Sequence, residues 1–310
     1  MTVGIGRKFG RRISLLTDTM ISDSAVGKRD AFPGRLKGII LSPYVSVAYA
    51  GHADPALSAI RQARKQLLSS GEVSEVANVL AGACTTSGAD VEFILAFHRD
   101  GEPFLHKITA RGISGDVENC FIGDPDVVRK VLAEEPNQPG YDNPEWGVQA
   151  AEIQFNGAFF RLFSDAGSLV NDTVGGFPIS LLGSPYGHIY QGQTLSMAWD
   201  PIHTATGITP AQQRAQLTGA TAFNYSVVGG SLRGVAVIGV ALPQAGLGFV
   251  YSPLSADDPE RLRVEIPDSP GFIDDAPLQA AVRARVNELL TEIGGGVFEL
   301  NAPQEARPVS

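Results

Sequence analysis

The chain has 310 residues, of which 44% are hydrophobic and 18% are charged, and its formal net charge is −9. This composition is typical of a globular protein and excludes a fibrous or disordered chain. The negative charge and the scattered Lys and Arg argue against a nucleic-acid partner, because phosphate contacts need a basic patch. The longest apolar run of the C-terminal part, Val235–Leu242, is too short to span a membrane.

The first residues lack the apolar stretch of a secretory signal, so we expect a cytoplasmic protein without a membrane partner. The two cysteines, Cys84 and Cys120, form no C-x-x-C pair and indicate reduced core thiols. The five histidines do not have the spacing of a zinc site. We therefore expect neither a metal nor another cofactor.

Apolar runs joined by turn residues alternate along the chain with segments of helical spacing. The Phe9-Gly10 turn predicts a hairpin that places Thr2 at the start of the first strand. Asp100-Gly101 predicts a second hairpin, because Asp-Gly accepts the positive φ angles of tight turns. The elements expected up to residue 195 are strands at 2–8, 11–17, 36–41 and 44–50, helices at 54–68 and 73–84, a hairpin at 91–108, a strand at 117–122, helices after Gly123 and at 148–163, and strands at 173–182 and 188–195.

Hairpins, rather than βαβ crossovers, join most of these strands. The expected fold class is therefore α+β, with antiparallel sheets stacked between helical layers. Residues 196–310 are additional to this pattern, and we interpret them as a small appended domain or a C-terminal extension. The elements expected in residues 196–310 are a helix after Thr209-Pro210, strands at 234–242, 246–251 and 262–266, and a helix at 276–293.

Five segments occur in an order that is typical of one family. They are TVGIGRKFG at the start, LLTDT at 15–19, Lys37 followed by VAYAGHAD at 47–54, CFIGDPD at 120–126 and NDTVGGFPISLL at 171–182. Together they resemble proteasome β-type subunits and, in its short bacterial form, the bacterial proteasome homologue Anbu, over about 195 of the 310 residues. The resemblance implies a four-layer αββα sandwich of two antiparallel sheets, the fold of N-terminal-nucleophile hydrolases, in residues 1–195.

The resemblance also implies catalytic roles. In that family the hydroxyl of an N-terminal Thr is the nucleophile, and its own α-amino group, with a pKa of roughly 7.7–8.0, is the base. Thr2 takes this role once Met1 is removed. Lys37 carries over as the ammonium that lowers the pKa of the nucleophile, and Asp18 as the carboxylate that positions Lys37. The backbone N–H of Gly51 carries over as the oxyanion-hole donor.

The spacing matches the family pattern, but three positions depart from it. Where the family has Ser after the Gly of its central hairpin, this chain has Asp124, which we interpret as the cap of the helix that begins at Pro125. Where the family has Asp and then Ser ahead of its paired glycines, this chain has Asn171 and Val174. Asp172 is displaced by one position, which leaves the proton-handling network around the amine incomplete, and it stays among the candidate catalytic residues.

Two alignments stay open. Aligning the chain on Val3-Gly4-Ile5 instead of on Asp18 puts Thr2 inside the strand and leaves no residue at the nucleophile position. Gly229-Gly230 also competes with Gly175-Gly176 for the closing strand. We favour the earlier pair, because two expected helices precede it directly and the later pair requires a long insertion.

The resemblance implies a threonine-type hydrolase that cleaves peptide or other amide bonds within a homo-oligomer shaped as a ring or spiral. A close variant is an amidohydrolase for a small amide, in which the C-terminal extension covers the pocket. The alternative from a different class is a non-catalytic protein, like the structural subunits of proteasomes. In that case residues 196–310 serve assembly or the binding of a partner.

Overall fold

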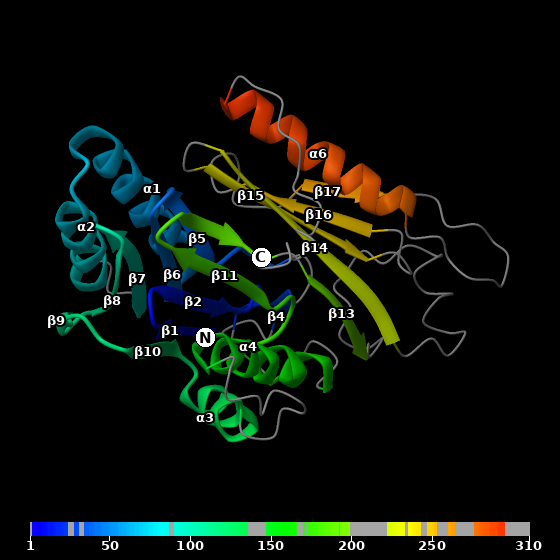
Figure 1. The fold of residues 1–310 in the computed structure, drawn as a ribbon, viewed down its shortest axis with the longest axis horizontal. Coiled ribbons are helices and arrows are strands. Elements are labelled where there is room, and N and C mark those ends of the chain that lie inside the picture. Colours follow the sequence, from blue (N-terminus) through cyan, green and yellow to red (C-terminus); the bar gives the residue numbers. More distant parts are fainter. Residues whose placement is uncertain are drawn as a thin grey trace, which may run out of the picture.

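The computed structural model of the protein describes residues 2–23, 28–30, 34–86, 90–135, 147–165, 170–171, 173–191, 193–198, 222–232, 235–242, 247–252, 260–263 and 276–294. These residues form antiparallel sheets and helices, which confirms the expected α+β class (Figure 1).

The first sheet contains the N-terminal hairpin. Its five strands, in spatial order, are β10 (Asn119–Gly123), β1 (Val3–Phe9), β2 (Arg12–Thr17), β11 (Ile179–Ser184) and β12 (Gly187–Tyr190). The hairpin register places Gly4 opposite Thr17. Thr2, which precedes β1, and Asp18, which follows β2, therefore lie side by side at the same end of the sheet.

The second sheet contains the other predicted hairpins. Its strands, in spatial order, are β5 (Gly38–Ser42), β6 (Val45–Gly51), β7 (Val91–Arg99), β8 (Glu102–Thr109) and the short β9 (Gly112–Ile113). Asp100 and Gly101 connect β7 to β8 with φ angles of 55° and 78°. These positive angles are those that the Asp-Gly sequence favours, so the predicted hairpin is confirmed.

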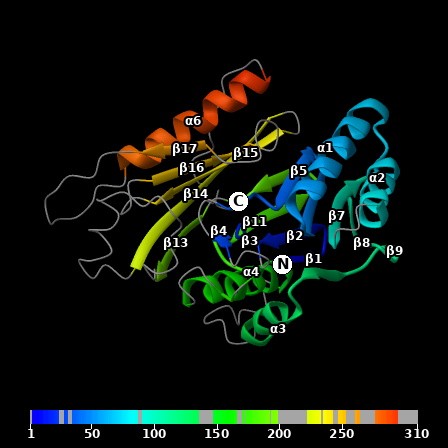
Figure 2. The ribbon, with the colours of Figure 1, turned by 180° about the vertical axis from the view of Figure 1, so that it is seen from behind.

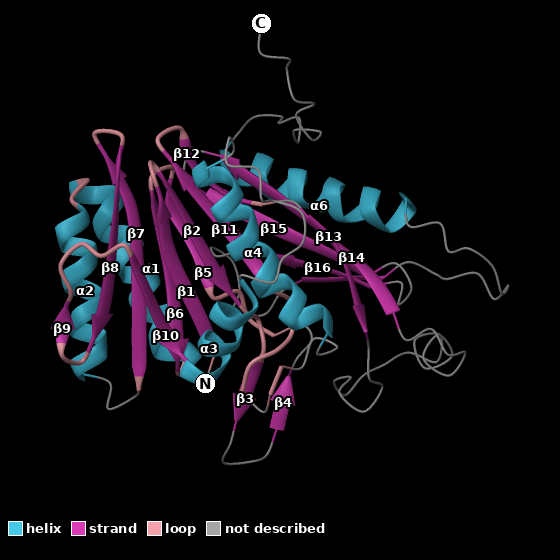
Figure 3. Cartoon of the chain, turned by 60° about the horizontal axis from the view of Figure 1, so that its bottom comes forward, coloured by secondary structure: helices cyan, strands magenta, loops and turns pink. Residues whose placement is uncertain are grey.

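Helices cover the outer faces of both sheets. Helices α1 (Ala53–Ser70) and α2 (Val73–Thr86) pack on the second sheet, and α3 (Pro125–Glu134) and α4 (Gly147–Asp165) pack on the first. The inner faces of the two sheets contact each other through β1, β2, β6, β7 and β8 (Figure 3). The layers therefore follow the order helix, sheet, sheet, helix.

A third antiparallel sheet lies beside this sandwich (Figure 2). Its strands, in spatial order, are β13 (Gln193–Ala198), β14 (Ala222–Leu232), β15 (Val235–Leu242), β16 (Leu247–Tyr251) and β17 (Glu260–Arg263). Alternate residues point to opposite faces, so Ile238 and Phe249 join the main core while Val237 and Val250 pack against α6 (Ala276–Gly294). The Phe249 ring lies 5.8 Å from that of Phe177. The main core thus extends from the sandwich into the third sheet.

Several elements differ from the sequence prediction. The strand predicted at 173–182 begins only at Ile179, because Gly176, with a φ angle of 80°, belongs to the preceding loop. The strand predicted at 188–195 is divided between β12 and β13. The sequence did not predict β14, whose Gly229-Gly230 pair weakens the strand signal, or the small hairpin of β3 (Ile21–Asp23) and β4 (Lys28–Asp30). The helix predicted after Thr209-Pro210 lies outside the described residues.

Candidate active site

Three of the predicted site residues meet in one buried cluster. The Thr2 hydroxyl donates to Asp18 Oδ1 and accepts from Lys37 Nζ. Lys37 Nζ also donates to Asp18 Oδ1 at 2.8 Å and to the Met20 carbonyl at 2.5 Å. Only 1% of Thr2, 0% of Asp18 and 4% of Lys37 is exposed. The hydroxyl therefore lies between a carboxylate and an ammonium, away from bulk water.

Backbone hydrogen bonds bring Lys37 to this end of the sandwich. The Lys37 carbonyl accepts from Tyr49 N at 3.1 Å, and Arg35 N donates to the Thr19 carbonyl at 2.6 Å. Gly34 allows this close approach, because its φ angle is +63° and a Cβ there would lie 2.0 Å from the Thr19 carbonyl oxygen. The chain entering β5 is thereby held against the chain leaving β2.

The observed register shows which residues lie beside Asp18, the position on which both open alignments depend. Thr2 lies outside β1 with its hydroxyl at Asp18, as the alignment on Asp18 requires. Gly175 donates its N–H to Asp18 Oδ2 at 3.2 Å, and its carbonyl accepts from Met20 N at 3.0 Å. Gly229-Gly230 instead lies within β14 of the third sheet. The earlier glycine pair is therefore the one beside the site.

The electrostatics of the cluster are set by Lys37. Burial lowers the pKa of the Lys37 amine below its usual value, while the charge of Asp18 and its hydrogen bond act in the opposite direction. A buried amine that is held against a hydroxyl by a carboxylate can stabilise the developing alkoxide of that hydroxyl. The cluster therefore has the chemistry that activates a nucleophilic Thr.

Gly51 ends β6 near this cluster. It is exposed, and a Cβ on it would lie 1.6 Å from the Asp90 carbonyl oxygen. The preceding residue, Ala50, packs against Gly123, where a Cβ would lie 3.4 Å from that of Ala50 and 1.9 Å from the Thr2 carbonyl oxygen. The close approach of Asp90 alone requires glycine at position 51. Its role as an oxyanion donor remains a prediction.

Asp124 caps helix α3, as the sequence predicted. Its Oδ1 accepts from Asp126 N at 2.9 Å and from Val127 N at 3.3 Å. Burial acts to raise the pKa of Asp124, but the hydrogen bonds donated to its carboxylate lower the pKa overall. The carboxylate is therefore well suited to a helix N-terminus.

The second oxygen of Asp124 connects this cap to the candidate site. It accepts from Asn171 Nδ2 at 2.8 Å and from Thr173 Oγ1 at 3.1 Å, and Asp124 N donates to the Thr2 carbonyl at 2.7 Å. Asp172, the predicted site residue between them, lies outside the described residues. Sequence reasoning missed Thr173, although an Asn two residues before it is a turn signal.

Comparison with protein-family models and with curated proteins finds no match to this chain. In the part of the chain that the structure describes, no group of three His, Cys, Asp or Glu side chains is placed to hold a metal ion. None of the described helices is both long enough and apolar enough to cross a membrane. Function is therefore inferred from the geometry of the Thr2 cluster.

Proposed function

We propose that the protein is a threonine-type N-terminal-nucleophile hydrolase that cleaves peptide or other amide bonds within a self-assembled homo-oligomer. The observation that carries this proposal is the position of the Thr2 hydroxyl between Lys37 Nζ and the Asp18 carboxylate. Lysine is rarely buried unless it is paired, and burying an ion pair has a desolvation cost. A nucleophile that needs an adjacent cation explains why that cost is tolerated at this position.

The mechanism begins with the removal of Met1, which gives Thr2 a free α-amino group. This amine accepts the proton of Oγ1 as the oxygen attacks the scissile carbonyl, and Lys37 stabilises the charge on the oxygen. The Gly51 N–H donates to the oxyanion of the tetrahedral intermediate. The protonated amine then gives its proton to the leaving amine, and an ester to Thr2 remains. Water, activated by the same amine, hydrolyses that ester.

The architecture supports the same proposal. Two antiparallel sheets lie between two pairs of helices, and Thr2 directly precedes the first strand of one sheet. This arrangement is compatible with the proteasome-like fold that the five sequence segments resemble. We therefore include membership of that family in the proposal, together with assembly into a ring or spiral.

A non-catalytic protein is the second candidate, and the burial of Thr2 favours it. With 1% of the residue exposed, the hydroxyl is out of reach of a substrate in the full chain. In addition, Asp124 and Asn171 replace the Ser and Asp of the family pattern. If Met1 is retained, the α-amino group is on the wrong residue. The cluster is then only a buried ion pair that is hydrogen-bonded to the Thr2 hydroxyl.

Two measurements on the protein purified from its own host separate the candidates. Intact mass shows whether the chain begins at Thr2. Labelling with a peptide β-lactone, which acylates nucleophilic hydroxyls, shows whether Thr2 reacts. A hydrolase is expected to lack Met1 and to be labelled at Thr2, with labelling lost in Thr2→Ala and partly kept in Thr2→Ser. Retained Met1, or equal labelling of wild type and Thr2→Ala, contradicts the hydrolase mechanism.

A further inference from the structure

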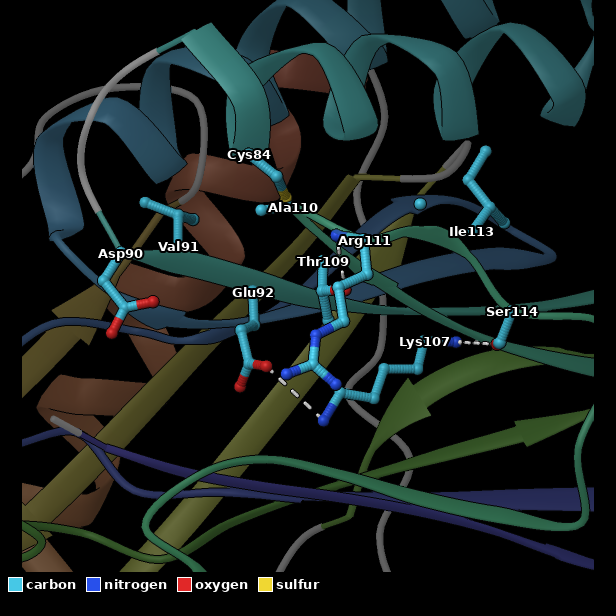
Figure 4. A pocket seen from close by; sticks show the side chains of 11 residues that line it. Cys84, Asp90, Val91, Glu92, Lys107, Thr109, Ala110, Arg111, Ile113 and Ser114 are labelled. Carbon is cyan, nitrogen blue, oxygen red and sulfur yellow. Dashed lines mark hydrogen bonds and ion pairs between the residues drawn. The ribbon is translucent and has the colours of Figure 1, made fainter.

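A pocket of about 680 Å³ lies between the C-terminal turn of α2 and strands β7, β8 and β9 (Figure 4). Pockets that bind small ligands have volumes of roughly 300–1,000 Å³. Cys84 lines one side of the pocket. Burial raises the pKa of its thiol to about 11, so the thiol stays protonated and does not act as a nucleophile. The charged side chains of the lining are Asp90, Glu92, Lys107 and Arg111.

Two of these four charges neutralise each other. Lys107 Nζ lies 3.4 Å from Glu92 Oε1, and each side chain is 29% exposed. Glu92 Oε2 accepts from Gly123 N at 3.1 Å, and Lys107 Nζ lies 5.1 Å from the centre of the Phe121 ring. Both charged groups therefore already have protein partners.

Arg111 is the cation left to bind a ligand. It lies in the turn between β8 and β9, where its backbone N–H donates to Thr109 Oγ1 at 3.1 Å. Its side chain is exposed and projects into the pocket, and within the described ranges its guanidinium has no hydrogen-bond or ion-pair partner (Figure 4). A guanidinium presents a planar pair of N–H groups that fits a carboxylate. Arg111 therefore favours an anionic ligand.

The strand register places this cation relative to the candidate oxyanion donor. Gly51 pairs with Val91 of β7, and the β7–β8 register, extended by two residues, sets Val91 opposite Ala110. Two strand spacings, about 10 Å, therefore separate Gly51 from the turn that carries Arg111. An extended peptide spans that distance in about three residues. The exposed carboxylate of Asp90, beside Gly51, disfavours an anion nearer to the site.

We propose that this pocket binds the free C-terminal carboxylate of a short peptide through Arg111. The scissile carbonyl at Gly51 then lies about three residues before that carboxylate, so the pocket selects the length of the released C-terminal fragment. This inference rests on the proposed function, because it places the pocket on the leaving-group side of the bond that Thr2 attacks. Lys107 adds a second positive charge, which Glu92 offsets.

The test compares two fluorescent hexapeptides with neutral side chains, one ending in a free carboxylate and one in a C-terminal amide. Both are titrated into the full-length Thr2→Ala protein, which cannot turn them over, and binding is followed by anisotropy. We expect the free acid to bind about tenfold more tightly than the amide. Arg111→Gln is expected to abolish this preference, and Arg283→Gln, at an exposed position on α6, is expected to keep it. Reduced-amide peptides give the same comparison on the wild-type chain.

Equal binding of acid and amide, no binding of either, or a preference that survives Arg111→Gln would overturn the proposal. The β-lactone experiment distinguishes its failure from failure of the proposed function. A carboxylate preference without labelling of Thr2 supports the pocket and contradicts the hydrolase. Labelling of Thr2 without a carboxylate preference supports the hydrolase and contradicts the pocket.

Discussion

A chain of buried hydrogen bonds between the two sheets makes stability depend on pH. Ser46 Oγ lies 2.6 Å from His188 Nδ1, His188 Nε2 lies 2.9 Å from His98 Nδ1, and His98 Nε2 lies 3.0 Å from the Arg11 carbonyl oxygen. Because the Arg11 carbonyl only accepts, His98 Nε2 carries a proton and donates it to that carbonyl. When His98 is neutral, its Nδ1 accepts from His188 Nε2. Burial lowers the pKa of both imidazoles, so both are neutral near pH 7 and Ser46 donates to His188. A proton added to either ring can be accommodated by rotation of the Ser46 hydroxyl, which also accepts, but it puts a charge on a buried ring.

The size of the effect follows from His188, which is 1% exposed. Burial, and then the neighbouring His98, lower the pKa of His188 from 6.5 to about 3. The unfolded chain therefore binds a proton between pH 6.5 and about 3 that the folded chain does not. The stabilisation is complete above pH 6.5 and is lost as the pH falls, by up to about 1.4 kcal/mol per pH unit.

Urea unfolding at pH 7.5 and at pH 5.0, for wild type and His188→Gln, measures this term. We expect wild type to lose about 2 kcal/mol more of its free energy of unfolding than the variant does between the two pH values. The variant removes the titrating group, so the pH dependence of groups that do not contact His188 cancels in the comparison. His188→Gln is also expected to be less stable at pH 7.5. An equal loss in both proteins would refute the proton assignment.

Three further substitutions or truncations test the packing around the site. Asp124→Ala is expected to lower the free energy of unfolding in urea by about 1–2 kcal/mol, because α3 loses its cap, whereas Asp124→Asn retains most of the stability. Equal stability of Asp124→Ala and wild type contradicts the capping role. Gly51→Ala is expected to lower the thermal unfolding midpoint by several degrees, because the φ angle of Gly51 is +97° and the Asp90 carbonyl blocks a Cβ. An unchanged midpoint contradicts that reasoning. Truncation after Leu195 is expected to cause aggregation, because it uncovers Phe177 and the core beneath the third sheet. A folded, monodisperse fragment contradicts a core that the sandwich shares with the third sheet.

The sequence predicted the parts of this protein that depend on local pattern. The Asp100-Gly101 hairpin and the Asp124-Pro125 helix start were predicted because their turn and cap chemistry lies within a few residues. The role of Thr173 was not predicted, because its bond to Asp124 joins positions 49 residues apart. The contact of Phe177 with Phe249 likewise depends on how the third sheet folds back. Only the family resemblance, and no local pattern, indicated that Asp18 and Lys37 would meet.

The Asp18 carboxylate is the point at which structure and catalysis can be separated. It accepts from Val3 N and Gly175 N, each at 3.2 Å, as well as from Thr2 and Lys37. Asp18→Asn keeps the shape of the side chain but leaves Lys37 as a buried amine without a counter-charge, and losing that charge lowers the pKa of Lys37 further. We expect a loss of about 3–5 kcal/mol in urea unfolding and, if Thr2 is the nucleophile, loss of its labelling.

The double variant Asp18→Asn with Lys37→Met separates the two losses. It removes both charges, so we expect most of the stability to return, because replacing both members of a buried ion pair with neutral groups is often close to neutral. Labelling is not expected to return, because the cation that stabilises the Thr2 oxygen is missing. Recovery of both properties would contradict a catalytic role for Lys37. Recovery of neither would show that the hydrogen bonds to Val3 and Gly175, and not the ion pair, hold this end of the sandwich together.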